Sequence, residues 1–412
     1  MIYFRSFSLQ QKQAILLYIC TLMGLFVGVL SSIINTNFID PIDYGDVRYV
    51  QNILNFVTTI VLFGYFQSGS RLLALSDSVE YSRRIKGVMV IILIICLFFL
   101  MISCVIGALI PTKKESIPFL FLVSIPICGN MLFFNYINTT AQGDNQISKI
   151  SVIRILPGLL YLPLAYLLYS TWGATSTRMI LLQWGIGSLI GICVIISTKP
   201  LFKDMRPIWR ELSSENRKYG KQLYIGSLVM VATNYLAGIF IGAYNIDNSQ
   251  VGFYTLALTI STPLMQLPSI IGTTYFKKFA KEVRIPKKVL NTTLVLSLLS
   301  CLLFIIIIKP LVLFLYNEKY AIVGSYASWL AIGYTLHGLG DLFNRYLGSH
   351  GRGKEIRNAS IANGIIKILG YSILIYFFNT KGALITTVAC SCIYAGCIYY
   401  YYTKFTKSNL YC

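Results

Sequence analysis

The stretch "KPLFKDMRPIWRELSSENRKYGKQ" (residues 199–222) is the longest polar segment of this 412-residue chain, and it separates two apolar halves. Its Ile208, Trp209 and Leu212 predict a short amphipathic helix that lies on the cytoplasmic surface of a membrane. We therefore expect an N-terminal lobe over residues 1–198, an amphipathic linker over 199–221 and a C-terminal lobe over 222–412.

The two halves are too apolar for a soluble protein. Hydrophobic residues make up 56% of the chain and charged residues only 12%, and the mean hydropathy is +0.67. Apolar runs that can cross about 30 Å of hydrocarbon, uncharged except for Lys367 in the eleventh, recur six times on each side of the linker. They predict an all-α integral membrane protein with twelve transmembrane helices. The runs are Ala14–Ile34, Tyr49–Ser70, Gly87–Ile110, Ser116–Gly143, Ile155–Thr177, Met179–Thr198, Gln222–Ile246, Asn248–Phe276, Val289–Ile308, Tyr320–Gly340, Asn358–Asn379 and Gly382–Thr403.

The basic residues predict the orientation of these spans. The formal net charge is +20, but 25 of the 35 Lys and Arg residues fall at the N-terminus, in the even-numbered loops and at the C-terminus, against 7 in the odd-numbered loops. Because Lys and Arg concentrate on the cytoplasmic side, both termini are expected inside. The excess charge then reflects topology and attraction to anionic headgroups, and no nucleic-acid partner is expected.

The two halves resemble each other as repeats of parallel topology. "NFIDPIDYG" (37–45) ends the first span and "YNIDNSQVG" (244–252) ends the seventh, and a shift of 207 residues aligns Ile39, Asp40 and Gly45 with Ile246, Asp247 and Gly252. Each half begins inside and holds six spans, so the halves are related as parallel repeats, an arrangement known in transporters.

Polar residues follow one face of the second and the eighth span at matching positions. Such stripes can pack helices together, and two stripes in the same register favour a shared cavity. The first stripe comprises Arg48, Asn52, Asn55 and Thr59, and the second Thr255, Thr259, Thr262 and Gln266, extended by Ser269 and Thr273.

Three segments resemble a known family. They are "DPIDYGDVRYVQNILNFVTTIVLFGYFQSGSRLLA" (40–74), "VGFYTLALTISTPLMQLPSIIGTTYFKKFAKE" (251–282) and "LVLFLYNEKYAIVGSYASWLAIGY" (311–334). They resemble the first loop and second helix, the eighth helix, and the tenth helix with its preceding loop in bacterial polysaccharide flippases. These flippases are the O-antigen and capsule repeat-unit translocases of the multidrug/oligosaccharidyl-lipid/polysaccharide exporter superfamily.

The resemblance implies a V-shaped pair of six-helix lobes around a cationic cavity that opens alternately to the two sides of the bacterial inner membrane. It also implies an undecaprenyl-pyrophosphate-linked oligosaccharide as substrate, membrane lipids as surroundings, and a polysaccharide polymerase and a chain-length regulator as candidate partners. No motif matches sharply enough to transfer a binding residue, so the site residues below are predicted from the residues alone.

A lysine stands in the middle of the eleventh span. In "NGIIKILGYSI" (363–373), Lys367 has no acidic residue within a helical turn, and a lysine at the bilayer midplane costs about 2.5–3.5 kcal/mol. Asn363 and Tyr371 share its face, which indicates a hydrated cavity rather than lipid. We therefore interpret Lys367 as an anchor for substrate phosphate, and the alternative is a structural ion pair with Asp341.

Two further spans carry charge. In "HGLGDLFNR" (337–345), His337, Asp341 and Arg345 share one helix side, which fits either a proton or sodium coupling site or a simple Asp341–Arg345 pair. Arg154 opens the fifth span, where it can line the cavity or extend to the headgroups.

An enzyme and a drug exporter are the alternative functions. A membrane polymerase or ligase needs positioned acids, bases or metal ligands, but the chain has two histidines, and the acids Asp40 to Asp46 are expected to form a capped turn with Pro41 and Gly45. A drug or cation exporter needs a buried carboxylate, for which Asp341 is the candidate. "GSHGRGKE" (348–355) lacks the strand and the Ser/Thr of a nucleotide-binding loop, so no nucleotide is expected to bind there. Taken together, these observations lead us to expect no cofactor, no metal and no enzymatic activity.

Overall fold

The computed structural model of the protein describes residues 9–76 and 78–408. The described chain folds into α-helices with short 3-10 and π-helical segments and contains no β-strand. Each apolar run found in the sequence falls on a helix, a broken pair of helices or one part of a long helix. The all-helical membrane fold predicted from the sequence is therefore confirmed.

The number of membrane-crossing helices is counted from length and apolar composition. Within the described residues eight helices meet both conditions, or nine when the bent pair α2 (Pro41–Val61) and α3 (Tyr65–Ala74) is counted as one span. The long helix α14 (Gly353–Ser408) counts once here, although Asn379 interrupts it with φ 51°. Helix α13 (Ile322–Ser349), which carries His337 and Asp341, is not in this set. Twelve spans therefore stay a prediction.

Contacts between residues divide the chain into two compact units. The first unit runs to Ile39 and continues over Val50–Leu228, and the second unit combines Asp40–Tyr49 with the chain from Val229 onward. The predicted boundaries of the two lobes, at 198 and 222, stay a prediction. In this division the beginning of α2 belongs to the second unit.

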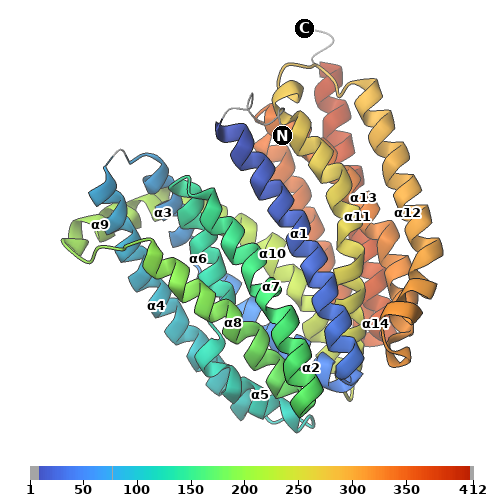
Figure 1. The fold of residues 1–412 in the computed structure, drawn as a ribbon. Helices are drawn as coiled ribbons and strands as arrows, with labels where there is room; N and C mark the ends of the chain where they lie inside the picture. The colour runs from blue at the N-terminus through green and yellow to red at the C-terminus, as the bar shows by residue number, and fades with distance from the viewer. Residues whose placement is uncertain (1–8, 77, 409–412) are drawn as a thin grey trace, which may run out of the picture. The chain divides into compact units, whose positions relative to one another are not determined.

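The first unit is a bundle of helices in which α1 packs on α7, α7 on α8, and α3 on α6 (Figure 1). The linker helix α9 belongs to this unit and buries Ile208 and Leu212, so its apolar face covers protein. Besides the helices already bounded, the unit comprises α1 (Leu9–Phe38), α4 (Val79–Leu109), α5 (Ser116–Ser124), α6 (Asn130–Gly143), α7 (Ile147–Trp172), α8 (Ser176–Ser197), α9 (Met205–Glu215) and the short segments η2 (Ile125–Ile127) and η3 (Asn216–Gly220).

The second unit is built around α13. Helices α11 and α14 pack along α13, and α12 packs on it as well (Figure 1). Large apolar side chains at one end form a core in which Phe279, Leu342, Tyr346 and Ile398 are buried. The remaining helices of this unit are α10 (Lys221–Tyr244, from Val229 onward), α11 (Ser249–Phe279), α12 (Lys287–Leu315) and the short segment η4 (Glu318–Tyr320).

The second predicted span is not one straight helix. Helices α2 and α3 meet at an angle of 59°, and Gly64 between them has φ 80°. The break is stabilised by the linker, because the Asn216 amide donates to the carbonyl oxygen of Phe63 at 3.1 Å and accepts from the Ser68 hydroxyl at 3.2 Å. A polar side chain thus satisfies a backbone group that the broken helix leaves open, which is how membrane helices tolerate such breaks.

The predicted capped turn over Asp40 to Asp46 is only partly right: Asp43 lies in the first turn of α2, as expected, but the residues from Pro41 onward are helical. Helix α2 begins at Pro41, a favourable first helical residue, and Gly45 lies inside the helix. A Cβ atom at Gly45 would lie 1.8 Å from the carbonyl oxygen of Asn248. Glycine is therefore required here by the close approach of another backbone segment and not by a turn.

Candidate functional site

Lys367 is the cation around which the candidate site of the second unit is built. It lies on α14, is partly buried, and donates a hydrogen bond of 2.6 Å to the side-chain oxygen of Asn234 on α10. Among the described residues no carboxylate forms an ion pair with it. The described structure therefore does not contain the Lys367–Asp341 ion pair that was the alternative interpretation. A lysine held by a neutral amide keeps an uncompensated positive charge where the surrounding helices are apolar.

Hydrogen-bonding groups surround this cation on α14 itself. Asn363 is buried, and its side-chain oxygen has no hydrogen-bond partner among the described residues. The Tyr371 hydroxyl lies 3.1 Å from the Thr387 hydroxyl, which is also 2.9 Å from the hydroxyl of Tyr254 on α11. The face predicted from the spacing of Asn363, Lys367 and Tyr371 is thus polar in the fold, with Tyr254 added from another helix.

The coupling candidates of α13 converge on Tyr394 of α14. The buried Tyr394 hydroxyl donates to Asp341 at 2.9 Å and accepts from the Asn344 amide at 2.7 Å. The His337 ring stacks on the Tyr394 ring, with centroids 4.4 Å apart and planes at 19°. The charge of Lys367 also acts on His337, so this cluster adjoins the lysine.

Arg345 does not join the cluster through Asp341. Within the described part of the chain, these two side chains form no ion pair, so the simple pair considered from the sequence is absent. Arg345 is exposed, and its side-chain carbons pack against Gly272 of α11, where a Cβ atom would lie 3.0 Å from Cγ. Asp341 is therefore hydrogen-bonded by a neutral phenol, and the charge of Arg345 acts on it without a direct ion pair.

Arg154 occupies a comparable position in the first unit. This partly buried residue of α7 donates to the Thr21 hydroxyl at 2.7 Å and to the side-chain oxygen of Asn138 at 3.3 Å. Both acceptors are neutral, as at Lys367. The guanidinium is held by side chains of α1 and α6, and its place in the cavity stays a prediction.

In both polar stripes the hydroxyl and the amide side chains differ in what they bond. Thr259 donates to the backbone oxygen of Thr255 at 2.9 Å, so its hydroxyl is satisfied within its own helix. The amides of Asn52, Asn55 and Gln266 are partly buried and form no hydrogen bond with another described residue. These three amides remain available to a ligand.

Arg48 is assigned to another unit than the two asparagines that follow it on α2. Its guanidinium lies over the Tyr44 ring, 4.8 Å from the centroid, in the part of α2 that belongs to the second unit, whereas Asn52 and Asn55 belong to the first. The structure therefore divides the predicted cavity residues between two units. Within the second unit it brings Asn363, Lys367 and Tyr371 together with His337 and Asp341.

Several residues of the site were not predicted from the sequence, among them Asn234, Tyr394 and Asn344. Asn234 is a lone amide in an otherwise apolar stretch of α10, and that isolation was a usable signal. Tyr394, in the middle of the twelfth predicted span, and Asn344, just after the tenth, gave no signal, because their roles arise only from packing of α13 on α14.

Comparisons with known proteins identify the family and the fold. The family model described as "Polysaccharide biosynthesis protein" matches residues 11–281. No curated protein sequence shows a significant match.

Solved structures show the same fold at low sequence identity. A structure of the lipid II flippase MurJ in an inward closed conformation is 14% identical, with a TM-score of 0.74 over 96% of this chain and 91% of that chain. An inward-facing multidrug resistance MATE family transporter of the MOP superfamily is 14% identical, with a TM-score of 0.68 over 93% and 95% of the two chains. A MOP superfamily transporter from Pyrococcus furiosus is 12% identical, with a TM-score of 0.64 over 96% of each chain.

The fold is thus that of MOP superfamily transporters, built as a multi-pass membrane protein. Because the family model covers well over half of the sequence, the chain belongs to the polysaccharide biosynthesis protein family.

Proposed function

We propose that this protein flips a lipid-linked oligosaccharide repeat unit across the bacterial cytoplasmic membrane for the synthesis of a surface polysaccharide. The family and the transporter fold support movement of a lipid-linked substrate and not an enzymatic reaction. The proposed substrate is an undecaprenyl-pyrophosphate-linked oligosaccharide, and the proposed mechanism is alternating access of two lobes. Both termini lie in the cytoplasm in this proposal, with a polymerase and a chain-length regulator as partners in the pathway.

The observation that carries the proposal is the uncompensated charge of Lys367. A pyrophosphate cannot cross hydrocarbon without a countercharge, because an unpaired ion there is very costly. Lys367 supplies a compact countercharge with rotatable donors, and the neutral Asn234 holds it without neutralising it. A phosphate that replaces this contact gains a charge-assisted hydrogen bond, and its release restores the amide contact.

The sugar portion of the substrate needs neutral hydrogen-bonding groups. The Asn363 oxygen has no hydrogen-bond partner among the described residues but is buried, so it would accept from a sugar hydroxyl only after the transport cycle exposes it. The amides of Asn52, Asn55 and Gln266 offer both donors and acceptors. Arg154 and Arg48 add positive charge that suits an anionic substrate better than a cation.

The second candidate function is export of a drug or organic cation. It would require Asp341 to present a free carboxylate, but that carboxylate is engaged by Tyr394, and the charge of Lys367 acts on the adjoining His337. A cationic substrate would therefore meet repulsion at this site. For Asp341 and His337 we propose ion coupling instead.

The test is transport of a defined substrate by purified protein. Proteoliposomes are loaded with a fluorescent polyprenyl-pyrophosphate oligosaccharide, and its exposure is measured by an enzyme or quencher added outside. Faster exposure than in protein-free vesicles supports the proposal. Transport of organic cations with no effect on the lipid-linked sugar would instead favour the exporter.

A further inference from the structure

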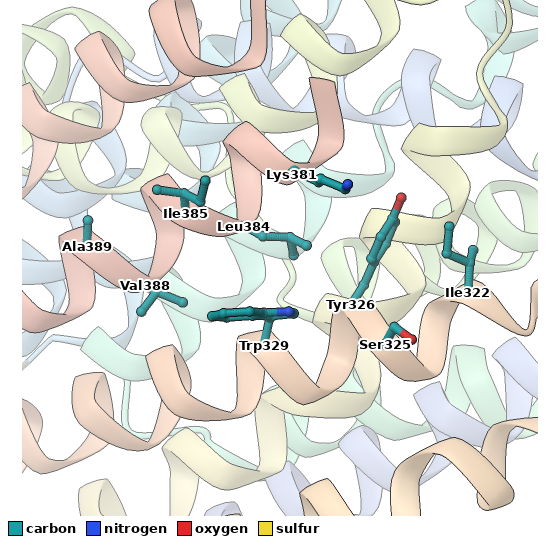
Figure 2. Close-up of a pocket in the computed structure, with 9 residues that line it drawn as sticks. All are labelled: Ile322, Ser325, Tyr326, Trp329, Lys381, Leu384, Ile385, Val388 and Ala389. Atoms are coloured by element: carbon teal, nitrogen blue, oxygen red, sulfur yellow. The ribbon is translucent and has the colours of Figure 1, made fainter. Parts of the chain in front are cut away.

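An apolar groove lies between α13 and the part of α14 that follows Asn379. Its volume is about 730 Å³, and apolar side chains such as Trp329, Ile385 and Val388 form most of its walls. Figure 2 shows the α13 side chains facing those of α14 across the groove. The groove lies outside the Lys367 cluster and shares none of its residues.

One end of the groove is polar and positively charged. Figure 2 shows Lys381, from α14, pointing toward Tyr326 of α13. These two residues also line a second, polar cavity of about 470 Å³ at the break around Asn379. In that cavity Gln250 accepts hydrogen bonds from the Tyr326 hydroxyl at 2.9 Å and from Thr380 at 3.0 Å. An apolar compartment and a polar one therefore meet at Lys381.

The charge of Lys381 is not neutralised within the protein. Lys381 is exposed and forms no ion pair with another residue of the described chain. The neighbouring basic residue Lys319 differs, because it is paired with Asp40. An anionic group at the mouth of the groove would thus find one available ammonium group, on a stem that can follow it.

The groove is open at the surface of the molecule, where its apolar walls are suited to lipid. Trp329 is 60% exposed and Ile385 51% exposed, and both lie on helices of a membrane protein. Apolar surface of this kind faces lipid chains, and tryptophan is favoured near the headgroup level. A ligand therefore reaches the groove from the membrane and needs no aqueous path.

The length of the groove matches one leaflet. Along α14 it extends from Lys381 to Ala389, which is about 12 Å at the helical rise of about 1.5 Å per residue. Half of a hydrocarbon core measures about 15 Å. An acyl chain whose headgroup lies at Lys381 would follow the groove over most of its length, whereas a polyprenyl chain exceeds it several times.

We propose that this groove binds one anionic phospholipid of the surrounding bilayer. Its phosphate pairs with Lys381 beside the polar cavity, and one acyl chain lies between Trp329 and Val388. On the proposed topology this lipid belongs to the outer leaflet. The site is separate from the proposed translocation of substrate, and binding can be measured without transport.

The test is lipid retention by purified protein. The protein is equilibrated in detergent with equal amounts of phosphatidylglycerol and phosphatidylcholine of identical acyl chains, and retained lipid is measured by native mass spectrometry. We expect one phosphatidylglycerol per protein. Lys381→Gln should lower its retention about tenfold, as expected for a lost hydrogen bond between charged groups. Ala389→Trp should fill the groove and remove both lipids.

Two matched variants control for unspecific effects. Lys113→Gln removes an exposed charge from another loop, and Leu302→Trp enlarges a lipid-facing side chain of α12 outside the groove. Both should retain phosphatidylglycerol, and all four variants should melt within a few degrees of the parent in lipid-free detergent. Equal retention by Lys381→Gln and Lys113→Gln would overturn the proposal. So would preferential retention of added undecaprenyl phosphate, which would assign the groove to the substrate lipid.

Discussion

The carboxylate of Asp46 accepts a hydrogen bond of 2.7 Å from the side-chain amide of Asn248, and both residues are buried. Asp46 lies near the start of α2 and Asn248 directly before α11, the two helices that correspond in the internal repeat. Gly45 and Gly252, which the repeat aligns, also meet here, since a Cβ atom at Gly252 would lie 3.2 Å from Cα of Gly45. The two segments that the predicted repeat aligns are therefore in contact, and this contact attaches the start of α2 to the rest of the second unit.

The first prediction is that this contact is needed for stability. Gly45→Ala should destabilise the protein by about 1–3 kcal/mol, because the new methyl group collides with the backbone of Asn248. Asn248→Ala should cost a similar amount, about 1–3 kcal/mol, since it leaves a buried carboxylate without this donor. Thermal unfolding in detergent measures both effects. Gly396→Ala is the control, since a Cβ atom there meets nothing within 4 Å, and equal melting of all three variants would contradict the prediction.

The second prediction concerns ion coupling at Asp341. If this carboxylate binds the coupling ion, Asp341→Asn should abolish the dependence of transport on the proton or sodium gradient while the protein still inserts. Tyr394→Phe removes the hydrogen bond to Asp341 and should shift the pH or sodium dependence without abolishing transport. Proteoliposomes with imposed gradients provide the measurement.

Arg345 supplies the control for that experiment. Because it forms no ion pair with Asp341 in the described chain, Arg345→Gln should leave the gradient dependence unchanged. The exchange Asp341→Arg with Arg345→Asp should not restore transport, as it would if the two residues acted as a simple pair. Full gradient dependence in Asp341→Asn would remove the coupling role.

The third prediction concerns topology. Reporter fusions after Asp43, Ser249 and Glu318 should report an outside location, and fusions after Arg84, Arg217 and Lys354 an inside location. The reason is the concentration of Lys and Arg in the loops expected to be cytoplasmic. An outside signal at Arg217 would contradict both the twelve-span count and the placement of the linker.

The sequence predicted those features that depend on local composition. Long apolar runs predicted the membrane helices, and the depth of Lys367 in such a run singled it out. Partners from distant segments could not be predicted, because Asn234 precedes Lys367 by 133 residues and Tyr394 follows Asp341 by 53. The bend between α2 and α3 was missed for the same reason, since the linker residue Asn216 stabilises it.

The last prediction concerns Lys367, and Asn234 makes it sharper than the sequence alone allowed. If the ammonium group binds substrate phosphate, Lys367→Met should lower substrate affinity by about ten- to a hundredfold, the equivalent of about 1.5–3 kcal/mol for a lost hydrogen bond between charged groups. Surface polysaccharide should then be lost at normal protein abundance. Lys367→Arg keeps the charge and should retain partial export. Asn234→Ala removes only the neutral partner, so the lysine stays charged and export should continue.

A lysine that serves only to join α14 to α10 would give the reverse result: Asn234→Ala would be as damaging as Lys367→Met, and both would lower protein abundance. Normal export by Lys367→Met would remove the anchor altogether. Export that returns when Asp341→Asn is added to Lys367→Met would indicate an ion pair formed during the transport cycle, in place of a phosphate site.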